Sequence, residues 1–389
     1  MNHHPWISFT QPVSLTELLV DLGGRCAAML SEMTAHPVRP VMANQLRTIF
    51  LSKGVHGTTA IEGNTLTVEQ MREIIETQKI TTAPSKRQLQ LEVLNLVDAY
   101  KYVQTMVQEQ EPGALLTVDT ICQVHRRVAQ GLDHIRAVPG AIRTGRVVVG
   151  SLYLPPEGEA HLREQLGRLG PWLMGQRLAQ SPMLDGLIRA VVAHVYLAWI
   201  HPFDDGNGRT SRTVELGLLM AAGVPFEGAV LMANHYNETR PIYMDRLARA
   251  SREDRGNLTG FVEYALQGLH DNLEAALDLV RTETMRSAWE NYVYDTFRTA
   301  HGHRLASVAA RQRTLMLAIS AKMAPLSRTE IEALPELARA YPQLPSKSLS
   351  RDIAACRKLD LLAVMPDRRL VARFDLMRAF QIGARPRLP

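Results

Sequence analysis

The segment at residues 201–212, with the sequence HPFDDGNGRTSR, combines side chains that suit phosphate chemistry. Histidine accepts a proton near neutral pH, so His201 is a candidate general base that deprotonates a hydroxyl nucleophile. Asp205 offers the hard oxygen ligands that Mg²⁺ takes together with water and phosphate oxygens. A base and a metal-binding carboxylate this close together indicate a site that transfers a phosphate-containing group.

The second half of the segment predicts an anion site at the start of a helix. Gly206, Asn207 and Gly208 form a turn whose backbone N–H groups, at a helix N-terminus, attract anions. Arg209 and Arg212 follow one turn apart, so both guanidinium groups can contact the same phosphate chain. Each feature by itself is commonly structural, and it is their fixed spacing that carries the prediction.

Two helices must position this segment. Met183–Ile200 is strongly apolar, is predicted to be the central core helix, and delivers His201 at its C-terminal end. Arg209–Ala222 follows the turn and stops at Gly223. Thr67 and Gln70 form a capping box, and Pro84 is expected to end the helix that they open. Further helices are predicted at Leu15–Met33, from Val41 to Gly63, and at Leu89–Gln110, Thr117–Leu132 and 240–282.

Composition indicates a mainly α-helical protein. Its 389 residues are 46% hydrophobic, mostly at helical spacing, which is enough for a sizeable core in two or three domains. Cys26, Cys122 and Cys356 are too scattered for a disulfide framework or a zinc cluster and are expected to be small buried hydrophobes. No signal peptide is evident, and the apolar stretch Ala190–Ile200 is too short to span a bilayer. We therefore expect a cytoplasmic protein with no membrane partner.

The C-terminal region carries the basic charge of the chain. The formal net charge is +5, and residues 311–389 hold 15 Lys and Arg against 7 Asp and Glu. Capping residues and periodicity predict three helices followed by a hairpin, the pattern of a winged helix-turn-helix. The elements are Arg311–Met323, a short helix capped by Ser327 and Glu330, Ser346–Leu359, and strands Leu361–Met365 and Leu370–Phe374.

The charge of this region favours DNA as a partner. Lys347 and Arg351 on the third helix, with Arg368 and Arg369 in the hairpin turn, are the candidate contacts. Winged helices also serve in protein interaction and dimerisation, and these alternatives stay open.

Residues 201–212 match at every position the signature of the Fic family, H-x-F-x-(D/E)-G-N-(G/K)-R-x-x-R. The resemblance implies a Fic-type helical bundle with a small β-hairpin flap. It also implies transfer of AMP from ATP to a Ser, Thr or Tyr hydroxyl of a target protein, with the protein itself among the candidate targets. Two alternatives stay open: a DNA-binding regulator with a Fic sensor domain, and a Fic enzyme that uses another donor or removes AMP.

The resemblance assigns a role to each position of the segment. Phe203 is expected to anchor the loop in the core. The family pattern makes His201 the base, Asp205 the ligand of a Mg²⁺ ion on the α- and β-phosphates, Gly206, Asn207 and Gly208 the α-phosphate site, Arg209 the β-phosphate contact and Arg212 the γ-phosphate contact.

Two further segments resemble parts of Fic proteins. The stretch from Arg143 to Pro156 is similar to the flap that docks the target's main chain beside the active site, which gives Val147, Val148, Val149 and Gly150 as docking residues. An ordinary surface hairpin is the alternative. Tyr243 and Ser251 lie on a segment similar to the family's adenine-side helix. Met244 and Ser251 depart from the residues usual there.

Thr58 and Glu62 resemble the inhibitory motif (S/T)-x-x-x-E-(G/N) of the family. Glu62 would reach across to Arg212 and occupy the γ-phosphate site, which would prevent productive ATP binding. Its position before the Fic motif implies the class with an N-terminal, intramolecular inhibitor. In some relatives the same glutamate supports removal of AMP, and the sequence leaves that open.

These observations predict four regions and an assembly. We expect an N-terminal helical region at 1–105 with the inhibitory helix near 56–64, a catalytic core at 106–285, a linking helix at 286–310 and a winged helix-turn-helix at 311–389. Because relatives often dimerise, a homodimer is a candidate assembly.

Overall fold

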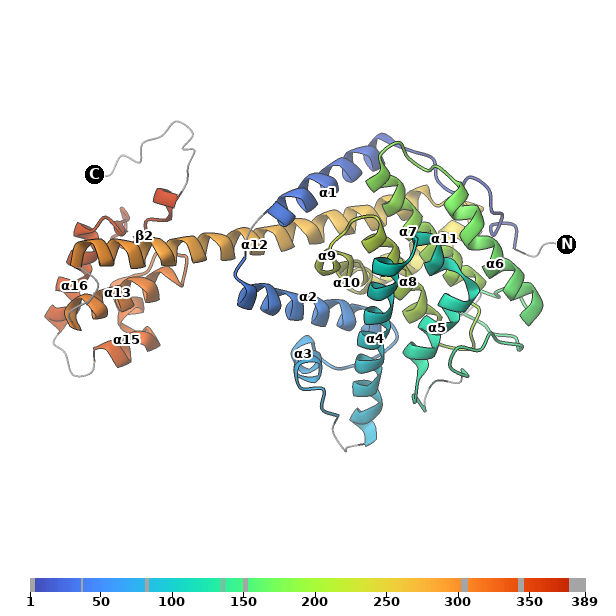
Figure 1. The fold of residues 1–389 in the computed structure, drawn as a ribbon, viewed down its shortest axis with the longest axis horizontal. Coiled ribbons are helices and arrows are strands. Elements are labelled where there is room, and N and C mark those ends of the chain that lie inside the picture. Colours follow the sequence, from blue (N-terminus) through green and yellow to red (C-terminus); the bar gives the residue numbers. More distant parts are fainter. Residues whose placement is uncertain are drawn as a thin grey trace. The chain divides into compact units, whose positions relative to one another are not determined.

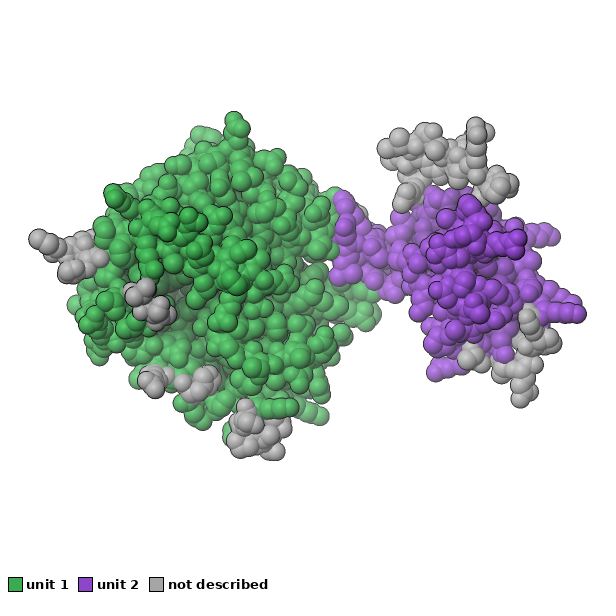
Figure 2. All heavy atoms as spheres, turned by 180° about the vertical axis from the view of Figure 1, so that it is seen from behind, with its two compact units in different colours: residues 1–35, 40–277 green, residues 36–39, 278–389 purple. Residues whose placement is uncertain are grey.

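The computed structural model describes residues 4–35, 38–80, 84–133, 135, 137–149, 153–301, 307–341 and 346–377. The predicted mainly α-helical class is confirmed, with one two-stranded sheet in the described part of the chain (Figure 1). The chain divides into two compact units, one of residues 1–35 and 40–277 and one of residues 36–39 and 278–389 (Figure 2). Residues of the predicted N-terminal region and catalytic core therefore fall within the same unit.

In the residues that the structure describes, the regular elements of the first unit are helices, apart from one isolated bridge. Its helices are α1 (Glu17–Ala35), α2 (Pro40–Ile61), α3 (Val68–Thr77), α4 (Pro84–Glu109), a 3₁₀ helix (Pro112–Leu116), α5 (Val118–Ala129), α6 (Glu159–Gly175), α7 (Pro182–Ile200), α8 (Asn207–Ala221), α9 (Phe226–Ala229), α10 (Leu231–Glu238) and α11 (Arg240–Arg252). Helix α12 (Thr259–His301) contains the boundary between the two units.

Helices α7 and α8 form the centre of the first unit (Figure 1). Ser181 caps α7 by accepting a hydrogen bond from the Leu184 N–H, and Pro182 occupies the first turn, where its missing N–H costs nothing. The second half of α7, from Ala190 to Ile200, is buried on almost every face, as expected for a helix surrounded by others. Helix α4 packs on α8 and α2 packs on α10, so both bring their side chains close to the start of α8.

The expectation that the apolar stretch of α7 is too short for a bilayer is wrong on length. The helix has 19 residues and, among the described residues, is the one that is long and apolar enough to cross a membrane by length and composition. In the structure 72% of its apolar window is buried against other helices. Core helices pass the same length test, and the burial of α7 is that of a core helix.

Turn chemistry explains where several helices begin and end. Gly63 takes a φ of +100° just after α2, and the Thr67/Gln70 capping box opens α3, both as predicted. Pro84 was expected to end a helix, but it begins α4, because a proline in the first helical turn loses no hydrogen bond. The predicted helix at 240–282 is broken between α11 and α12, where Gly256 takes a φ of +94°.

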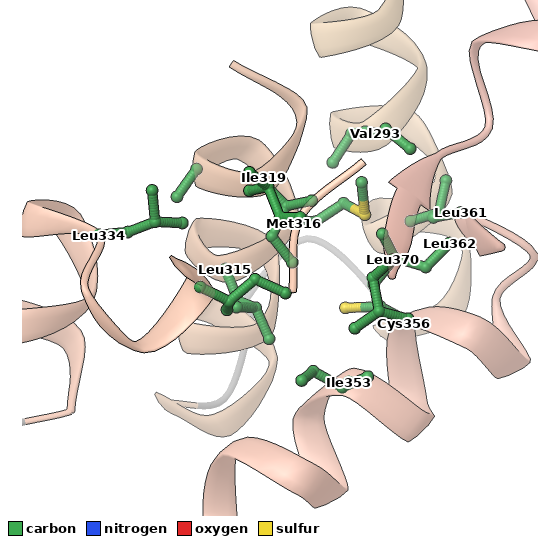
Figure 3. Packing of buried hydrophobic residues seen from close by; sticks show 14 of the residues in the cluster. Val293, Leu315, Met316, Ile319, Leu334, Ile353, Cys356, Leu361, Leu362 and Leu370 are labelled. Carbon is green, nitrogen blue, oxygen red and sulfur yellow. The ribbon is translucent and has the colours of Figure 1, made fainter. Parts of the chain in front are cut away.

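The second unit has its own hydrophobic core. Its elements after α12 are α13 (Ser307–Ser320), α14 (Arg328–Glu332), α15 (Pro335–Ala340), α16 (Ser346–Lys358), β1 (Leu362–Val364), β2 (Leu370–Ala372) and a 3₁₀ turn (Phe374–Met377). Side chains from five helices, α12 to α16, and from the hairpin meet in this core, among them Val293, Leu315, Met316, Ile353, Cys356 and Leu370 (Figure 3).

The elements of the second unit follow the predicted order, with two differences. The Ser327/Glu330 capping box opens α14, and β1 pairs antiparallel with β2 with Leu362 opposite Ala372. Helix α15 was not predicted, and both strands are shorter than expected. The winged-helix assignment itself stays a prediction. Cys26 and Cys356 are buried as expected, whereas Cys122 is half-buried.

A glycine contact between α2 and α10 gives a test of this packing. A Cβ on Gly57 would lie 2.7 Å from the backbone of Ala233 and Asn234, so G57A must separate the two helices. We expect G57A to lower the free energy of unfolding by about 1–3 kcal/mol, the usual cost of overpacking. Urea unfolding followed by circular dichroism measures it.

The control for this variant is Gly24→Ala on α1. Nothing lies within 4 Å of a Cβ at Gly24, and alanine is the better helix former, so we expect a gain of up to about 1 kcal/mol. Equal stabilities of the two variants would contradict the close approach of α2 and α10.

Candidate functional site

His201 lies at the C-terminal end of α7 in a strained backbone conformation. Its φ of 48° and ψ of 60° are left-handed, and its N–H donates to the Leu197 carbonyl at 3.0 Å. The ring Nδ1 lies 3.3 Å from the Ala198 carbonyl, which is an acceptor, so Nδ1 carries the proton. This tautomer leaves Nε2 as the free acceptor that a general base requires.

The surroundings of His201 keep its ring neutral. Burial is the largest effect and lowers the pKa of His201 to about 4, and the Arg143 charge acts in the same direction. The carbonyl of Ala198 and the carboxylates of Glu62 and Asp205 oppose this shift but do not outweigh it. At neutral pH the side chain is therefore an unprotonated base.

The loop after His201 is held by its own side chains. Phe203 is fully buried, as expected for an anchor. Asn207 binds both backbone groups of Phe203: its Oδ1 accepts from the N–H at 2.9 Å and its Nδ2 donates to the carbonyl at 2.8 Å. The Asn207 side chain thus fixes the loop, and its backbone N–H and one amide proton remain for an anion.

Gly206 and Asp205 stand at the start of α8. Gly206 takes a φ of +78°, which favours glycine, and its N–H donates to Asp205 Oδ1 at 2.5 Å. The Asp205 side chain is 41% exposed, so its second oxygen can reach a metal ion in solvent. The described residues contain no group of three or more metal-ligating side chains. A single carboxylate suits Mg²⁺, which keeps water and phosphate oxygens as its other ligands.

Glu62 contacts Arg212 as the sequence predicts. Glu62 Oε1 accepts a hydrogen bond from Arg212 Nη2 at 2.5 Å, and the same Nη2 donates to the Thr58 carbonyl at 3.0 Å. Burial opposes ionisation of Glu62, but the charges of Arg212 and Arg209 and the hydrogen bond outweigh it, so the pKa of Glu62 is lowered. Thr58 is buried and its hydroxyl lies 3.1 Å from the Tyr100 hydroxyl.

Gly208 is required by this contact. A Cβ at Gly208 would lie 2.1 Å from Glu62 Oε1, so a side chain there would push the carboxylate away from Arg212.

Glu92 is a site residue that sequence reasoning missed. This buried carboxylate on α4 forms an ion pair with Arg209, and its other oxygen accepts from Asn64 Nδ2 at 2.7 Å. Arg209 Nη2 also donates to Asp205 Oδ1 at 3.3 Å. The available signal was a glutamate among the apolar positions of α4, because a charge on such a stripe must find a partner.

His125 is a second site residue that sequence reasoning missed, and the available signal was again a polar residue among the buried positions of a helix. It lies on the buried stripe of α5 and stacks on Phe203 with ring centroids 3.7 Å apart. Its Nδ1 accepts from the Gly140 N–H at 3.0 Å, so Nε2 carries the proton and donates to the Asp205 carbonyl at 3.0 Å. This neutral ring therefore holds the loop that precedes α8.

Arg143 connects the predicted flap to the base. Its Nε donates to the His201 carbonyl at 2.8 Å, and its two terminal nitrogens donate to the carbonyls of Gly145 and Pro156. Both ends of the flap are thus tied to the loop beside His201.

In the described residues of the flap, one antiparallel bridge joins Val149 and Tyr153. Val148 is exposed and Val147 is half-buried, whereas Gly150 lies outside the described residues.

Tyr243 and Ser251, the predicted adenine-side residues, are both buried. Tyr243 is 3% exposed, and its hydroxyl lies 3.0 Å from His194 Nε2. His194 Nδ1 in turn lies 2.6 Å from Glu215 Oε2, so Tyr243 belongs to a buried polar set beneath Arg212. Ser251 is buried and its hydroxyl donates to the Ala248 carbonyl of its own helix. As they stand, neither side chain offers surface to a nucleotide base.

The arrangement has donors left for an anion. The Nε atoms of Arg209 and Arg212 are buried and have no hydrogen-bond partner within the described structure. The N–H groups of the first turn of α8 have no acceptor inside the helix. Buried donors without acceptors are costly, so this end of α8 suits a phosphate chain.

Comparison with known proteins agrees with this site. Residues 115–219 match the Fic/DOC family model. The chain is 37% identical over 173 residues to the protein adenylyltransferase Fic of Nematostella vectensis, covering 44% of this chain and 38% of the relative. It is 31% identical over 230 residues to the protein adenylyltransferase fic-1 of Caenorhabditis elegans, covering 59% and 42%. The chain thus spans about two fifths of the length of these relatives.

Solved structures of Fic proteins share the fold. A fragment of C. elegans Fic-1, residues 134–508 of that protein, aligns with a TM-score of 0.52 at 26% identity, covering 68% of this chain and 73% of the fragment. A Fic family protein from Desulfovibrio desulfuricans aligns with a TM-score of 0.55 at 19% identity, covering 93% and 98%, which supports the fold alone.

The neutral ring of His125 gives a pH prediction. Burial is the main cause that lowers its pKa from 6.5 to about 4. Between these values the unfolded chain binds more protons, so the stability present above pH 6.5 is lost as the pH falls towards 4. We expect this histidine to contribute up to about 3 kcal/mol of that loss.

Urea unfolding at pH 7 and pH 5 measures the effect. His125→Gln should have a lower free energy of unfolding than the wild type at pH 7 but should lose less of it between pH 7 and pH 5. The pH dependence that remains in this variant includes the contribution of His201. The control is His161→Gln, at a side chain that is 42% exposed. Equal pH slopes for the wild type and H125Q would contradict the prediction.

Proposed function

We propose, on the premise that residues 115–219 form a Fic/DOC family domain, that this protein transfers AMP from ATP to a hydroxyl group of a target protein. The observation that carries the proposal is a neutral histidine, His201, beside a helix N-terminus with two buried arginines. The names of the relatives, protein adenylyltransferase, support the same reaction.

The side chains suit an in-line displacement at the α-phosphorus. His201 Nε2 accepts the proton of the target hydroxyl as its oxygen forms a bond to the α-phosphorus. The bond from that phosphorus to the bridging oxygen breaks, and pyrophosphate leaves. The N-terminus of α8 and the guanidinium groups of Arg209 and Arg212 neutralise the charge on the phosphate chain.

The site also fits Mg²⁺. Asp205 would hold the ion through its exposed oxygen, and the ion would supply positive charge to the phosphates of ATP. Arg143 and His125 do not contact substrate in this scheme. They keep the loop between α7 and α8 in the conformation that places His201 and Asp205 together.

Glu62 would make the enzyme inactive at rest. Its carboxylate occupies Arg212, the arginine assigned to the γ-phosphate, and a second anion cannot take the same position without a repulsive contact. Release of Glu62 would free Arg212 for ATP. The alternative that Glu62 also supports removal of AMP stays open.

Three substitutions test the reaction and its inhibition. We expect Glu62→Gly to raise AMP transfer about 10- to 100-fold, because the charge-assisted bond that it removes is worth about 1.5–3 kcal/mol. Glu62→Gln should give a smaller rise, and His201→Ala combined with E62G should abolish transfer. Incorporation of labelled AMP into the protein itself and into a lysate measures all of them, with and without Mg²⁺.

The exposed Glu73 on α3 provides the matched control, because Glu73→Ala removes a carboxylate that lies outside the site. An unchanged rate in E62G would refute the inhibitory role. Parallel reactions with labelled GTP, UTP and CTP distinguish ATP from other donors.

We further propose that the second unit binds DNA. Lys347 and Arg351 lie one turn apart on the exposed face of α16, and Arg368 and Arg369 are exposed in the turn between β1 and β2. Arg369 is partly neutralised by Asp367, at 2.7 Å. The basic helix and turn together support phosphate contacts, and an enzyme with a DNA-binding unit accommodates both functions.

A gel shift with duplex DNA tests this proposal. We expect binding that weakens with salt, and a Lys347→Ala/Arg351→Ala variant that binds less tightly with a salt slope smaller by about 2. The control removes the same charge elsewhere in the unit, at the exposed residues Lys322 and Arg339. Equal binding by both double variants, or none at low salt, would exclude DNA contact through α16.

A further inference from the structure

The carboxylate of Glu92 contacts two separate elements of the site. One oxygen pairs with Arg209 on α8, and the other accepts a hydrogen bond from Asn64, which follows α2. Both side chains that meet Glu92 are almost fully buried, since Arg209 is 3% and Asn64 6% exposed. A buried carboxylate with two such donors holds both of them in fixed positions.

Asn64 is the end of the short turn that carries Glu62. The turn closes on α2 through hydrogen bonds from the Gly63 and Asn64 N–H groups to the Ala60 and Thr59 carbonyls. We call Glu62, Gly63 and Asn64 the inhibitory turn.

The Asn64 side chain ties this turn to α4. Its Nδ2 donates to Glu92 Oε2 at 2.7 Å and to the Leu89 carbonyl at 3.0 Å, while its Oδ1 accepts from the Leu66 N–H at 3.0 Å. Every polar group of the Asn64 side chain is thus used to fix the inhibitory turn.

We propose that Glu92 and Asn64 are positioning residues that hold Glu62 against Arg212. The inference rests on the proposed function, and it adds the device that keeps the inhibitory glutamate in place. Neither residue touches Glu62 or Arg212 in the described contacts. They act through the turn on one side and through Arg209 on the other, so Arg209 and the inhibitory turn share one anchor.

The alternative is that Asn64 and Glu92 only stabilise the fold. In that case, loss of the Asn64 side chain would lower stability without changing inhibition. The two roles of Asn64 can be distinguished in a protein that already lacks Glu62. An anchor for Glu62 has nothing left to position in an E62G protein, whereas a purely structural residue has the same effect in either background.

The test compares Asn64→Ala with the wild type and with E62G, in the full chain. We expect N64A alone to raise AMP transfer about 3- to 10-fold and to strengthen Mg²⁺-ATP binding by the same factor. The change should appear mainly as a lower KM for ATP. In the E62G background N64A should change neither AMP transfer nor Mg²⁺-ATP binding by more than about twofold. Asn64→Asp, which keeps the shape but sets a second carboxylate against Glu92, should activate at least as strongly and guards against a folding defect.

Asn95→Ala is the matched control. Asn95 is a buried asparagine on the same α4, and its Nδ2 donates to the Val128 and Gln130 carbonyls, away from the inhibitory turn. We expect N95A to leave the inhibition unchanged even where it lowers stability. Activation by N95A equal to that by N64A would overturn the proposal, as would equal activation by N64A in both backgrounds or none in either.

A second variant tests Glu92 itself. Both partners of Glu92 donate hydrogen bonds, and glutamine has one oxygen where glutamate has two. Glu92→Gln must therefore lose either Asn64 or Arg209. Loss of Asn64 raises transfer in the wild-type background, and loss of Arg209 raises KM for ATP in the E62G background. If Glu92→Gln changed neither AMP transfer in the wild-type background nor KM for ATP in the E62G background, the role of Glu92 would be overturned.

Failure of the proposed function would be recognised separately. If E62G transfers no AMP from ATP, the reaction is wrong, and the anchor is then judged by calorimetric binding of Mg²⁺-ATP. Tighter binding by both N64A and E62G than by the wild type would support the anchor. Tighter binding by E62G alone would overturn it.

Discussion

The burial of two arginines in the first turns of α8 is the constraint on which the rest of the site depends. Arg209 and Arg212 are each 3% exposed. An unpaired charge at such depth is very costly, so carboxylates must reach both guanidinium groups. Glu62 comes from the turn after α2, Glu92 from α4 and Asp205 from the loop before α8. The elements that supply these carboxylates therefore lie around the start of α8, where they neutralise the charges of Arg209 and Arg212.

This requirement gives Glu62 two roles at once. In the absence of nucleotide it compensates the charge of Arg212, and a phosphate chain would compensate the same charge when bound. In the proposed function the carboxylate and the phosphate would be alternative partners of one cation, and inhibition would follow from the same electrostatics that stabilises the Glu62–Arg212 pair. Gly208 supports the state in which Glu62 pairs with Arg212, because a side chain there would collide with the Glu62 carboxylate.

The sequence predicts the chemistry of the site better than the residues that support it. The segment from His201 to Arg212, the Thr67 cap and the Glu62–Arg212 contact depend on local spacing or on a motif, and each has the predicted geometry. Glu92 pairs with Arg209, 117 positions away, and His125 bonds the Asp205 carbonyl, 80 positions away, so both contacts with the site are set by tertiary packing.

One error at a single position has a local physical cause. Pro84 is compatible with both the end and the start of a helix, so its presence alone does not decide between them. Tyr243 was assigned from a motif alone, and its burial next to Arg212 depends on tertiary packing that the motif does not contain.

The buried set around Tyr243 explains how Arg212 can stay in place when Glu62 leaves. Glu215 accepts from Tyr236 at 2.7 Å and from His194 at 2.6 Å, so His194 Nδ1 carries the proton and Nε2 is free to accept from Tyr243. The Tyr243 oxygen then has a lone pair left. Burial raises the pKa of Tyr243 to about 12, and the nearby charge of Arg212 opposes this rise. Every donor in this series faces an acceptor, and the negative charge of Glu215 stands at its end. Arg212 therefore has a polar neighbour besides Glu62, which would help to keep its guanidinium group in place if a phosphate replaced the carboxylate.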